Sequence, residues 1–195
     1  MKELFNVLYG WLFPVAWWSF LVYWLISACW ARKTKVAEAL LPRLLHFLIG
    51  TVALLILAFH DRFPAGIDRQ LWPQNKLTFW LGAAATLAGL GVAVWARIHL
   101  GRFWSGAITL KEGHRLIRSG PYQFVRNPIY TGIITGVAGT AIAIGKVSGL
   151  VAIALIYAVY AWKIRREQRL LAAEFGEEYT AYCREVPALV PSLKI

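Results

Sequence analysis

Long runs of apolar residues without an acidic or basic side chain constrain the fold of this chain more than any other feature. The five most apolar stretches are 4–30, 44–59, 77–94, 129–145 and 147–162. A helix needs about 20 residues to cross the roughly 30 Å of bilayer hydrocarbon. Only 16% of the 195 residues are charged, compared with about 25% in soluble domains. The pattern predicts an all-α integral membrane protein with about five transmembrane helices.

The distribution of basic residues predicts the orientation of these helices. If the N-terminus lies outside and the C-terminus is cytoplasmic, sixteen of the 21 lysines and arginines are cytoplasmic, as the positive-inside rule requires. The other five are Lys2, Arg62, Arg69, Lys76 and Lys146. Topology therefore accounts for the net charge of +11, and we expect no nucleic-acid partner. We expect a multi-pass protein of the bacterial inner membrane whose partner is the lipid bilayer; the sequence makes no prediction of oligomeric state.

Polarity divides the chain into two halves within a single membrane domain, residues 1–195. Residues 1–95 are expected to form three spans, of which the first two contribute mainly packing. Residues 97–195 hold a loop (97–127), a helical hairpin (128–162) and a cytoplasmic tail (163–195). Helix-to-helix loops usually have about 2–8 residues, so a loop of this length and polarity indicates a function.

The helix signals bring the loop and the tail together. Pro128 is expected to begin the fourth helix with Asn127 as its N-cap. The fifth helix is expected to leave the membrane, end near Phe175 at Gly176, and be followed by a short helix over 177–184. A two-helix hairpin returns the chain to the same side at about 10 Å, the usual helix–helix distance. The end of the loop and the start of the tail should therefore face each other across a cleft.

Several familiar kinds of site are absent from the sequence. The four histidines form no metal-binding cluster, and we expect no metal site. No GxSxG, GxxxxGK[ST] or HExxH motif occurs. No strand–GxGxxG–helix unit occurs either, so a Rossmann domain is not expected. Any nucleotide-like cofactor would have to bind between the loop and the helix ends.

Two ordered motifs carry a family resemblance. The sequences HRLIRSGPYQFVRNPIYTG (114–132) and RREQRLLAAEFGEEYTAYCREVPALVP (165–191) resemble the isoprenylcysteine carboxyl methyltransferase family. More broadly, they resemble the membrane methyltransferases that include the phospholipid N-methyltransferases. The match covers about the C-terminal half of the chain, with the family's spacing and topology.

The resemblance implies an S-adenosylmethionine-dependent methyltransferase that releases S-adenosylhomocysteine. The cofactor-binding residues that it implies are His114, Leu116, Ile117, Tyr122, Asn127, Pro128, Ile129, Tyr130 and Glu167. Lys163 lies where the eukaryotic enzymes of the family have a substrate-contacting arginine. Arg126 and Glu167 are the candidate catalytic residues: Glu167 suits the ammonium or a ribose hydroxyl of the cofactor, and Arg126 or His114 suits its carboxylate.

The acceptor is expected to be a lipidic or amphipathic molecule at the cytoplasmic face, with its tail entering from the bilayer between helices. An isoprenylcysteine-type carboxylate, a phospholipid amine, a quinone precursor and a small thiol all remain open. Three residues depart from the family pattern. Asn127 replaces a histidine, Gln168 replaces a glutamate, and Ala188 stands where a basic residue is common.

Two other functions are compatible with the same residues. The first is an NADPH-dependent membrane reductase related to the sterol reductases, in which Arg115, Arg118, Arg126 and Arg166 would bind phosphates. The second is a non-catalytic lipid-binding membrane protein, which would follow if the three departures had disabled the site.

Overall fold

The fold is described from a computed structural model, which covers residues 2–29, 34–36, 40–62, 64, 66–101, 110–111 and 116–191. The helices are α1 (Lys2–Ala28), α2 (Leu40–Ala58), α3 (Lys76–Leu100), α4 (Pro128–Ile144), α5 (Val147–Phe175) and α6 (Glu177–Glu185). Two 3-10 turns, η1 (His60–Arg62) and η3 (Gly120–Gln123), connect them. The short strands β1 (Thr34–Val36) and β2 (Leu110–Lys111) pair antiparallel.

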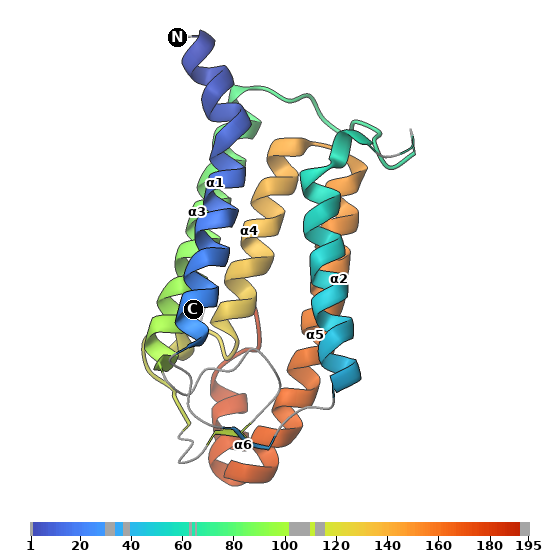
Figure 1. Ribbon diagram of the computed structural model, residues 1–195. Helices are drawn as coiled ribbons and strands as arrows, with labels where there is room; N and C mark the ends of the chain where they lie inside the picture. The colour runs from blue at the N-terminus through green and yellow to red at the C-terminus, as the bar shows by residue number, and fades with distance from the viewer. Residues whose placement is uncertain are drawn as a thin grey trace.

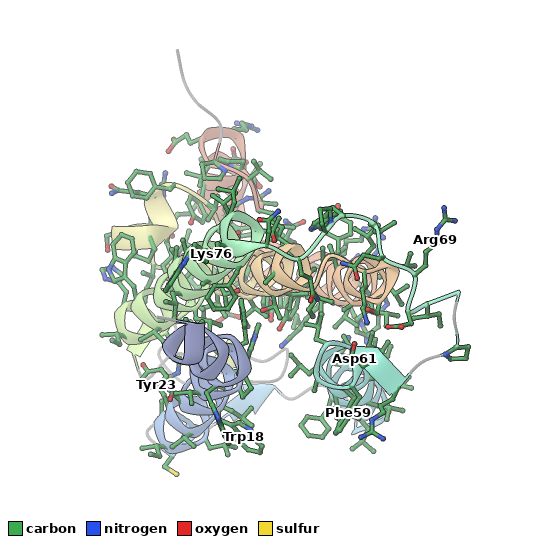
Figure 2. The ribbon with its side chains drawn as sticks, turned by 90° about the horizontal axis from the view of Figure 1, so that it is seen from above. Trp18, Tyr23, Phe59, Asp61, Arg69 and Lys76 are labelled. Carbon is green, nitrogen blue, oxygen red and sulfur yellow. The ribbon has the colours of Figure 1, made fainter. Side chains whose placement is uncertain are left out.

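The first five helices run alternately up and down (Figure 1). Helices α3, α4 and α5 form a row, and α1 and α2 lie on the same side of that row, apart from each other (Figure 2). The end of α3, the start of α4, the end of α5 and all of α6 gather at one end of the bundle (Figure 1). The prediction that the two polar segments lie on one side is thereby confirmed.

Within the described residues, each of the five predicted apolar stretches is helical over nearly all of its length, which confirms the all-α membrane class. Three segments are long and apolar enough to cross a membrane: Gly10–Ala28, Lys76–Leu100 and Val147–Phe175. The apolar helices Leu44–Ala58 and Pro128–Ile144 are shorter. At 1.5 Å per residue, the 17 residues of α4 reach about 26 Å, which is slightly less than the roughly 30 Å of hydrocarbon.

Glycines allow α3 and α4 to pack backbone against backbone. A Cβ atom added to Gly89 would lie 2.5 Å from the carbonyl oxygen of Gly132 and 2.5 Å from the amide nitrogen of Gly136. The buried hydroxyl of Thr86 donates to the Gly136 carbonyl at 3.1 Å. Small residues permit this approach inside a bilayer, where helix association depends on close packing rather than on the hydrophobic effect.

Lys146 connects the α4–α5 hairpin to the segment between α2 and α3. Its ammonium donates to the carboxylates of Asp61 and Asp68, and these hydrogen bonds raise the pKa of Lys146. Gly145, which precedes it, ends α4 in the left-handed conformation, with φ at +66°. The helical hairpin predicted over 128–162 is therefore present, and it closes in a tight turn at Gly145 and Lys146.

Replacing Lys146 with Met should lower the melting temperature by a few degrees. The ammonium contacts one carboxylate that is 70% exposed and another that is 34% exposed, and exposed ion pairs contribute about 0.2–1 kcal/mol. One kcal/mol corresponds to roughly 2–4 °C for a chain of this size. Thermal unfolding in detergent measures the change, with Arg62→Met, an exposed cation on η1, as the control. A drop that is the same in both variants would contradict a specific role for Lys146.

Candidate active site

The turn η3 places Tyr122 against the end of α3. A hydrogen bond of 2.9 Å joins the Ser119 hydroxyl to Nε2 of His99. The His99 ring stacks on the ring of Tyr122, with centroids 6.4 Å apart. Gly120 has φ at +60°, and a Cβ there would meet the His99 ring at 2.7 Å. Only glycine fits this position, so the Ser119–Gly120–Pro121 sequence determines where Tyr122 lies.

The C-terminal tail is bound to the start of α4 by backbone carbonyls. The amide of Arg126 donates to Pro187 at 2.9 Å, and the amide of Asn127 donates to Ala188 at 3.1 Å. The side-chain amide of Asn127 also donates to the Ala188 carbonyl, at 2.9 Å. Asn127 therefore occupies the predicted N-cap position, but its side chain binds the tail instead of capping α4.

Tyr130, in the first turn of α4, meets α5 at the predicted cleft. Its hydroxyl donates to Oε1 of Glu167 at 2.7 Å. Its ring stacks on that of Tyr160, with centroids 4.5 Å apart and planes 19° apart. Nζ of Lys163 lies 5.3 Å from the centroid of the Tyr130 ring. Residues 160, 163 and 167 share one face of α5 because they are spaced at i, i+3 and i+7. The Tyr130 side chain therefore contacts three groups from one face of α5: the carboxylate of Glu167, the ammonium of Lys163 and the phenol of Tyr160.

These residues line one end of a cavity of about 1400 Å3. Its lining comes mainly from α1, α2, α4 and α5. Figure 2 shows α1 and α2 on one side of the row formed by α3, α4 and α5. Most of the lining is apolar, and Trp17, Phe20 and Trp24 contribute large rings from α1. The first two spans, expected to contribute mainly packing, also supply residues to the cavity lining.

Nearly all of the site residues predicted from the sequence line the cavity. The lining includes Leu116, Ile117, Tyr122, Arg126, Asn127, Pro128, Ile129, Tyr130, Lys163 and Glu167. His114, and with it Arg115, lies outside the described residues. Gln168 contributes to a separate shallow groove between α5 and α6. The predicted cleft between loop and tail is thus present, and it is the polar end of a much larger apolar space.

Arg126 joins this cavity to α6. One guanidinium nitrogen, Nη1, donates to Sγ of Cys183. The Nε atom is buried and has no hydrogen-bond partner among the described residues. A buried guanidinium N–H without an acceptor is costly, but this atom is closed off from the cavity that other atoms of Arg126 line.

The tyrosines around the polar end are held in the neutral form. Burial, and then the charge of Glu167, raises the pKa of Tyr122 well above its ordinary value. Burial raises the pKa of Tyr182 to about 12, although Arg126 and Arg118 act in the opposite direction. The Tyr182 hydroxyl donates to the Tyr122 carbonyl. Both phenols therefore stay protonated well above neutral pH.

Sequence reasoning missed Tyr160 and the three aromatic residues from α1. Tyr160 was detectable, because it lies three residues before Lys163 and seven before Glu167 on a predicted helix. Trp17, Phe20 and Trp24 gave no such signal, since tryptophan and phenylalanine on a span are equally typical of lipid-facing anchors.

Comparison with known proteins gives a family. Residues 77–178 match the model of the phospholipid methyltransferase family, which is just over half of the chain. The matched segment contains α3, η3, α4, α5 and the first residues of α6. The chain belongs to the phospholipid methyltransferase family.

Three proteins are examples of relatives that are similar to this chain in sequence. Protein-S-isoprenylcysteine O-methyltransferase B of Arabidopsis thaliana is 28% identical over 132 residues, which are 66% of this chain and 64% of the relative. Cobalt-zinc-cadmium resistance protein CzcN of Cupriavidus metallidurans is 33% identical over 112 residues, 56% of this chain and 50% of the relative. Protein-S-isoprenylcysteine O-methyltransferase of Schizosaccharomyces pombe is 29% identical over 99 residues, which are 49% of this chain and 42% of the relative. The chain thus spans less than two thirds of the length of these relatives.

Proposed function

We propose that the chain is an S-adenosylmethionine-dependent methyltransferase that acts on a lipidic or amphipathic acceptor at the cytoplasmic membrane face. One observation carries the proposal: a charged, tyrosine-lined site around Tyr130 and Glu167 opens directly into a large apolar cavity. Family membership supports the reaction class. The concentration of basic residues in the loop and tail supports the cytoplasmic face.

The charges at the polar end fit the cofactor. S-adenosylmethionine supplies a methyl group on a sulfonium to a nucleophile, and it also carries an ammonium and a carboxylate. Glu167 can accept from the ammonium or from a ribose hydroxyl, and the guanidinium of Arg126, which lines the cavity, can donate to the carboxylate. The ring of Tyr130, already 5.3 Å from Nζ of Lys163, lies where it can face a cation.

The size and polarity of the cavity fit an acceptor with a hydrocarbon tail. A site for a single small ligand usually has about 300–1000 Å3, so about 1400 Å3 has room for a cofactor and part of a second molecule. Residues of both α1 and α2 line the cavity, and we propose that the acceptor enters from the bilayer between these helices. The names of two relatives make an isoprenylcysteine carboxylate one candidate acceptor.

A carboxylate acceptor suits the groups that are present. A carboxylate is already ionised, so methyl transfer to it requires no general base. Catalysis then comes from positioning and from exclusion of water, and positioning alone can be worth up to about 7–11 kcal/mol. Lys163 is buried, at 8% exposed, and its ammonium can orient such an acceptor at the mouth of the apolar space.

The reductase alternative receives less support from the same geometry. It requires several basic side chains to bind the phosphates of NADPH. Arg126 lines the cavity, whereas Arg118 pairs with Glu185 and Arg166 lies over the ring of Trp162. Arg115, the fourth candidate, is outside the described residues. We therefore favour methyl transfer.

Replacing Tyr130 with Phe should weaken cofactor binding by about tenfold. The change removes the hydroxyl that holds Glu167 but keeps the ring that faces Lys163, and a hydrogen bond to a charged group is worth about 1.5–3 kcal/mol. Equilibrium binding of labelled S-adenosylhomocysteine measures the effect. Tyr157→Phe, an exposed phenol on the same helix as Glu167, is the control. Equal affinity in the wild type and Tyr130→Phe would remove the hydroxyl from the proposal.

Labelled methyl transfer tests the function itself. The detergent-purified protein is incubated with S-adenosylmethionine carrying a labelled methyl group and with a panel of acceptors. The panel contains a prenylated cysteine, a phosphatidylethanolamine, a quinone precursor and a small thiol. We expect label in a lipidic acceptor and none in a tail-free analogue with the same nucleophile. Label in the tail-free analogue alone would contradict the role of the apolar cavity.

A further inference from the structure

Helix α1 is a wall of the cavity with very little buried surface of its own. Only 6% of the residues in its most apolar 18-residue window are buried. Among the α1 residues whose side chains are described, the buried one is Ser27, which is 3% exposed. Elsewhere along the helix, the indole of Trp17 donates to the Thr140 hydroxyl at 3.1 Å. Polar contacts therefore help to hold this wall, together with ring packing such as that of Phe13 on Phe79, with centroids 5.7 Å apart.

Arg97 makes the contact at the end of α1. It lies in the last turn of α3 and is buried, at 3% exposed. Its Nη2 donates to the carbonyl of Ser27, and its Nη1 donates to the carbonyl of Gly101 at 2.7 Å. Both carbonyls lie at helix C-termini, where the helix dipole concentrates negative charge. One guanidinium thus joins the C-terminal ends of α1 and α3.

The contact extends to the cavity through the last turn of α1. The Ser27 hydroxyl donates to the Trp24 carbonyl at 3.0 Å. Trp24 and Phe20 have rings 5.0 Å apart. Both line the cavity, and both pack on the buried cluster that contains Tyr122. Arg97 itself does not line the cavity, so its effect on a ligand is indirect.

We infer that Arg97 is a positioning residue: it fixes the last turn of α1, so that Trp24 and Phe20 form the acceptor-side wall next to the cofactor end of the cavity. Lysine cannot reproduce this contact, because it presents a compact ammonium rather than a planar fork able to reach two carbonyls. The statement about the acceptor rests on the proposed methyltransferase function. The statement about α1 does not.

A spin label on Cys29 tests the position of α1 without any activity measurement. Cys29 follows α1 directly and is exposed, and a Cys183→Ser background leaves it as the single cysteine. We expect the nitroxide to be more mobile in Arg97→Gln than in the parent and intermediate in Arg97→Lys. It should be unchanged in Arg69→Gln, an exposed cation at the other end of the bundle. Unchanged mobility in both Arg97 variants would overturn the inference. If Arg97→Gln does not fold, Arg97→Lys decides the question.

Steady-state kinetics with the lipidic acceptor then test the consequence. Relative to the same Cys183→Ser parent, Arg97→Lys should raise KM for the acceptor by about tenfold, while S-adenosylhomocysteine binds within about twofold of the parent. This is well below the roughly hundredfold that a 1 Å misplacement can cause. A more mobile label with an unchanged KM would overturn the link to the acceptor. A wild-type protein that methylates no acceptor would count against the proposed function, while the spin-label result would still decide the role of Arg97.

Discussion

Replacing Gly89 with Ala is expected to destabilise the protein by about 3 kcal/mol, which corresponds to a fall of roughly 6–12 °C in melting temperature. The new Cβ would lie 2.5 Å from two backbone atoms of α4 and 3.0 Å from a third, the carbonyl carbon of Thr135. Backbone atoms in the middle of a helix cannot rotate away as a side chain can. Helices α3 and α4 must therefore separate, which also displaces Tyr130 at the start of α4.

Gly91→Ala is the matched control for this prediction. It lies two residues further along α3, and no atom lies within 4 Å of its added Cβ. Alanine in a helix is more favourable than glycine by roughly 0.5–1 kcal/mol, so this variant should be as stable as the wild type or slightly more stable. Thermal unfolding in detergent compares the two. Equal melting temperatures for the Gly89 and Gly91 variants would contradict the close packing of α3 on α4.

Replacing Glu167 with Ala is expected to weaken cofactor binding by roughly a hundredfold. The carboxylate accepts the Tyr130 hydroxyl at 2.7 Å and is the acidic group at the polar end of the cavity among the described lining residues. A hydrogen bond to a charged partner is worth about 1.5–3 kcal/mol, and roughly 2.7 kcal/mol corresponds to a hundredfold in affinity. The substitution also removes the negative charge that lies one helical turn after the buried ammonium of Lys163 on α5.

Ligand-induced stabilisation measures this change. S-adenosylhomocysteine at about 100 times its dissociation constant should stabilise the wild type by about 2.7 kcal/mol, and at the same concentration it should have little effect on Glu167→Ala. Glu174→Ala is the control, because Glu174 is an exposed carboxylate two turns further along α5. A ligand-induced shift that survives in Glu167→Ala would exclude this carboxylate from the cofactor site.

Much of the fold was predictable because its signals are local. The absence of charge over 147–162, the basic residues that follow, and Gly176 together predict a helix that leaves the membrane and ends at Phe175, as it does. The start of α4 at Pro128 is a signal of the same kind. The strands β1 and β2 were not predicted, because three and two residues are too few to give a period.

The candidate site was predictable to the extent that topology determined it. A tight hairpin at Lys146 must return the chain to the side from which it left, so the contact between Tyr130 and Glu167 follows from the order of the helices. The cavity did not follow from the sequence, because it depends on the separation of α1 from α2, which no local pattern specifies. The partner of Cys183 was also missed: its contact with Arg126 joins residues 57 positions apart.

Calorimetric titration of the purified wild-type protein with S-adenosylhomocysteine, and separately with NADPH, tests the central claim most directly. The account predicts micromolar binding of S-adenosylhomocysteine and no binding of NADPH, because the polar end of the cavity offers Glu167 to an ammonium but only Arg126 to phosphates among the described arginines. Binding of NADPH alone would contradict it and would assign the cavity to a reductase.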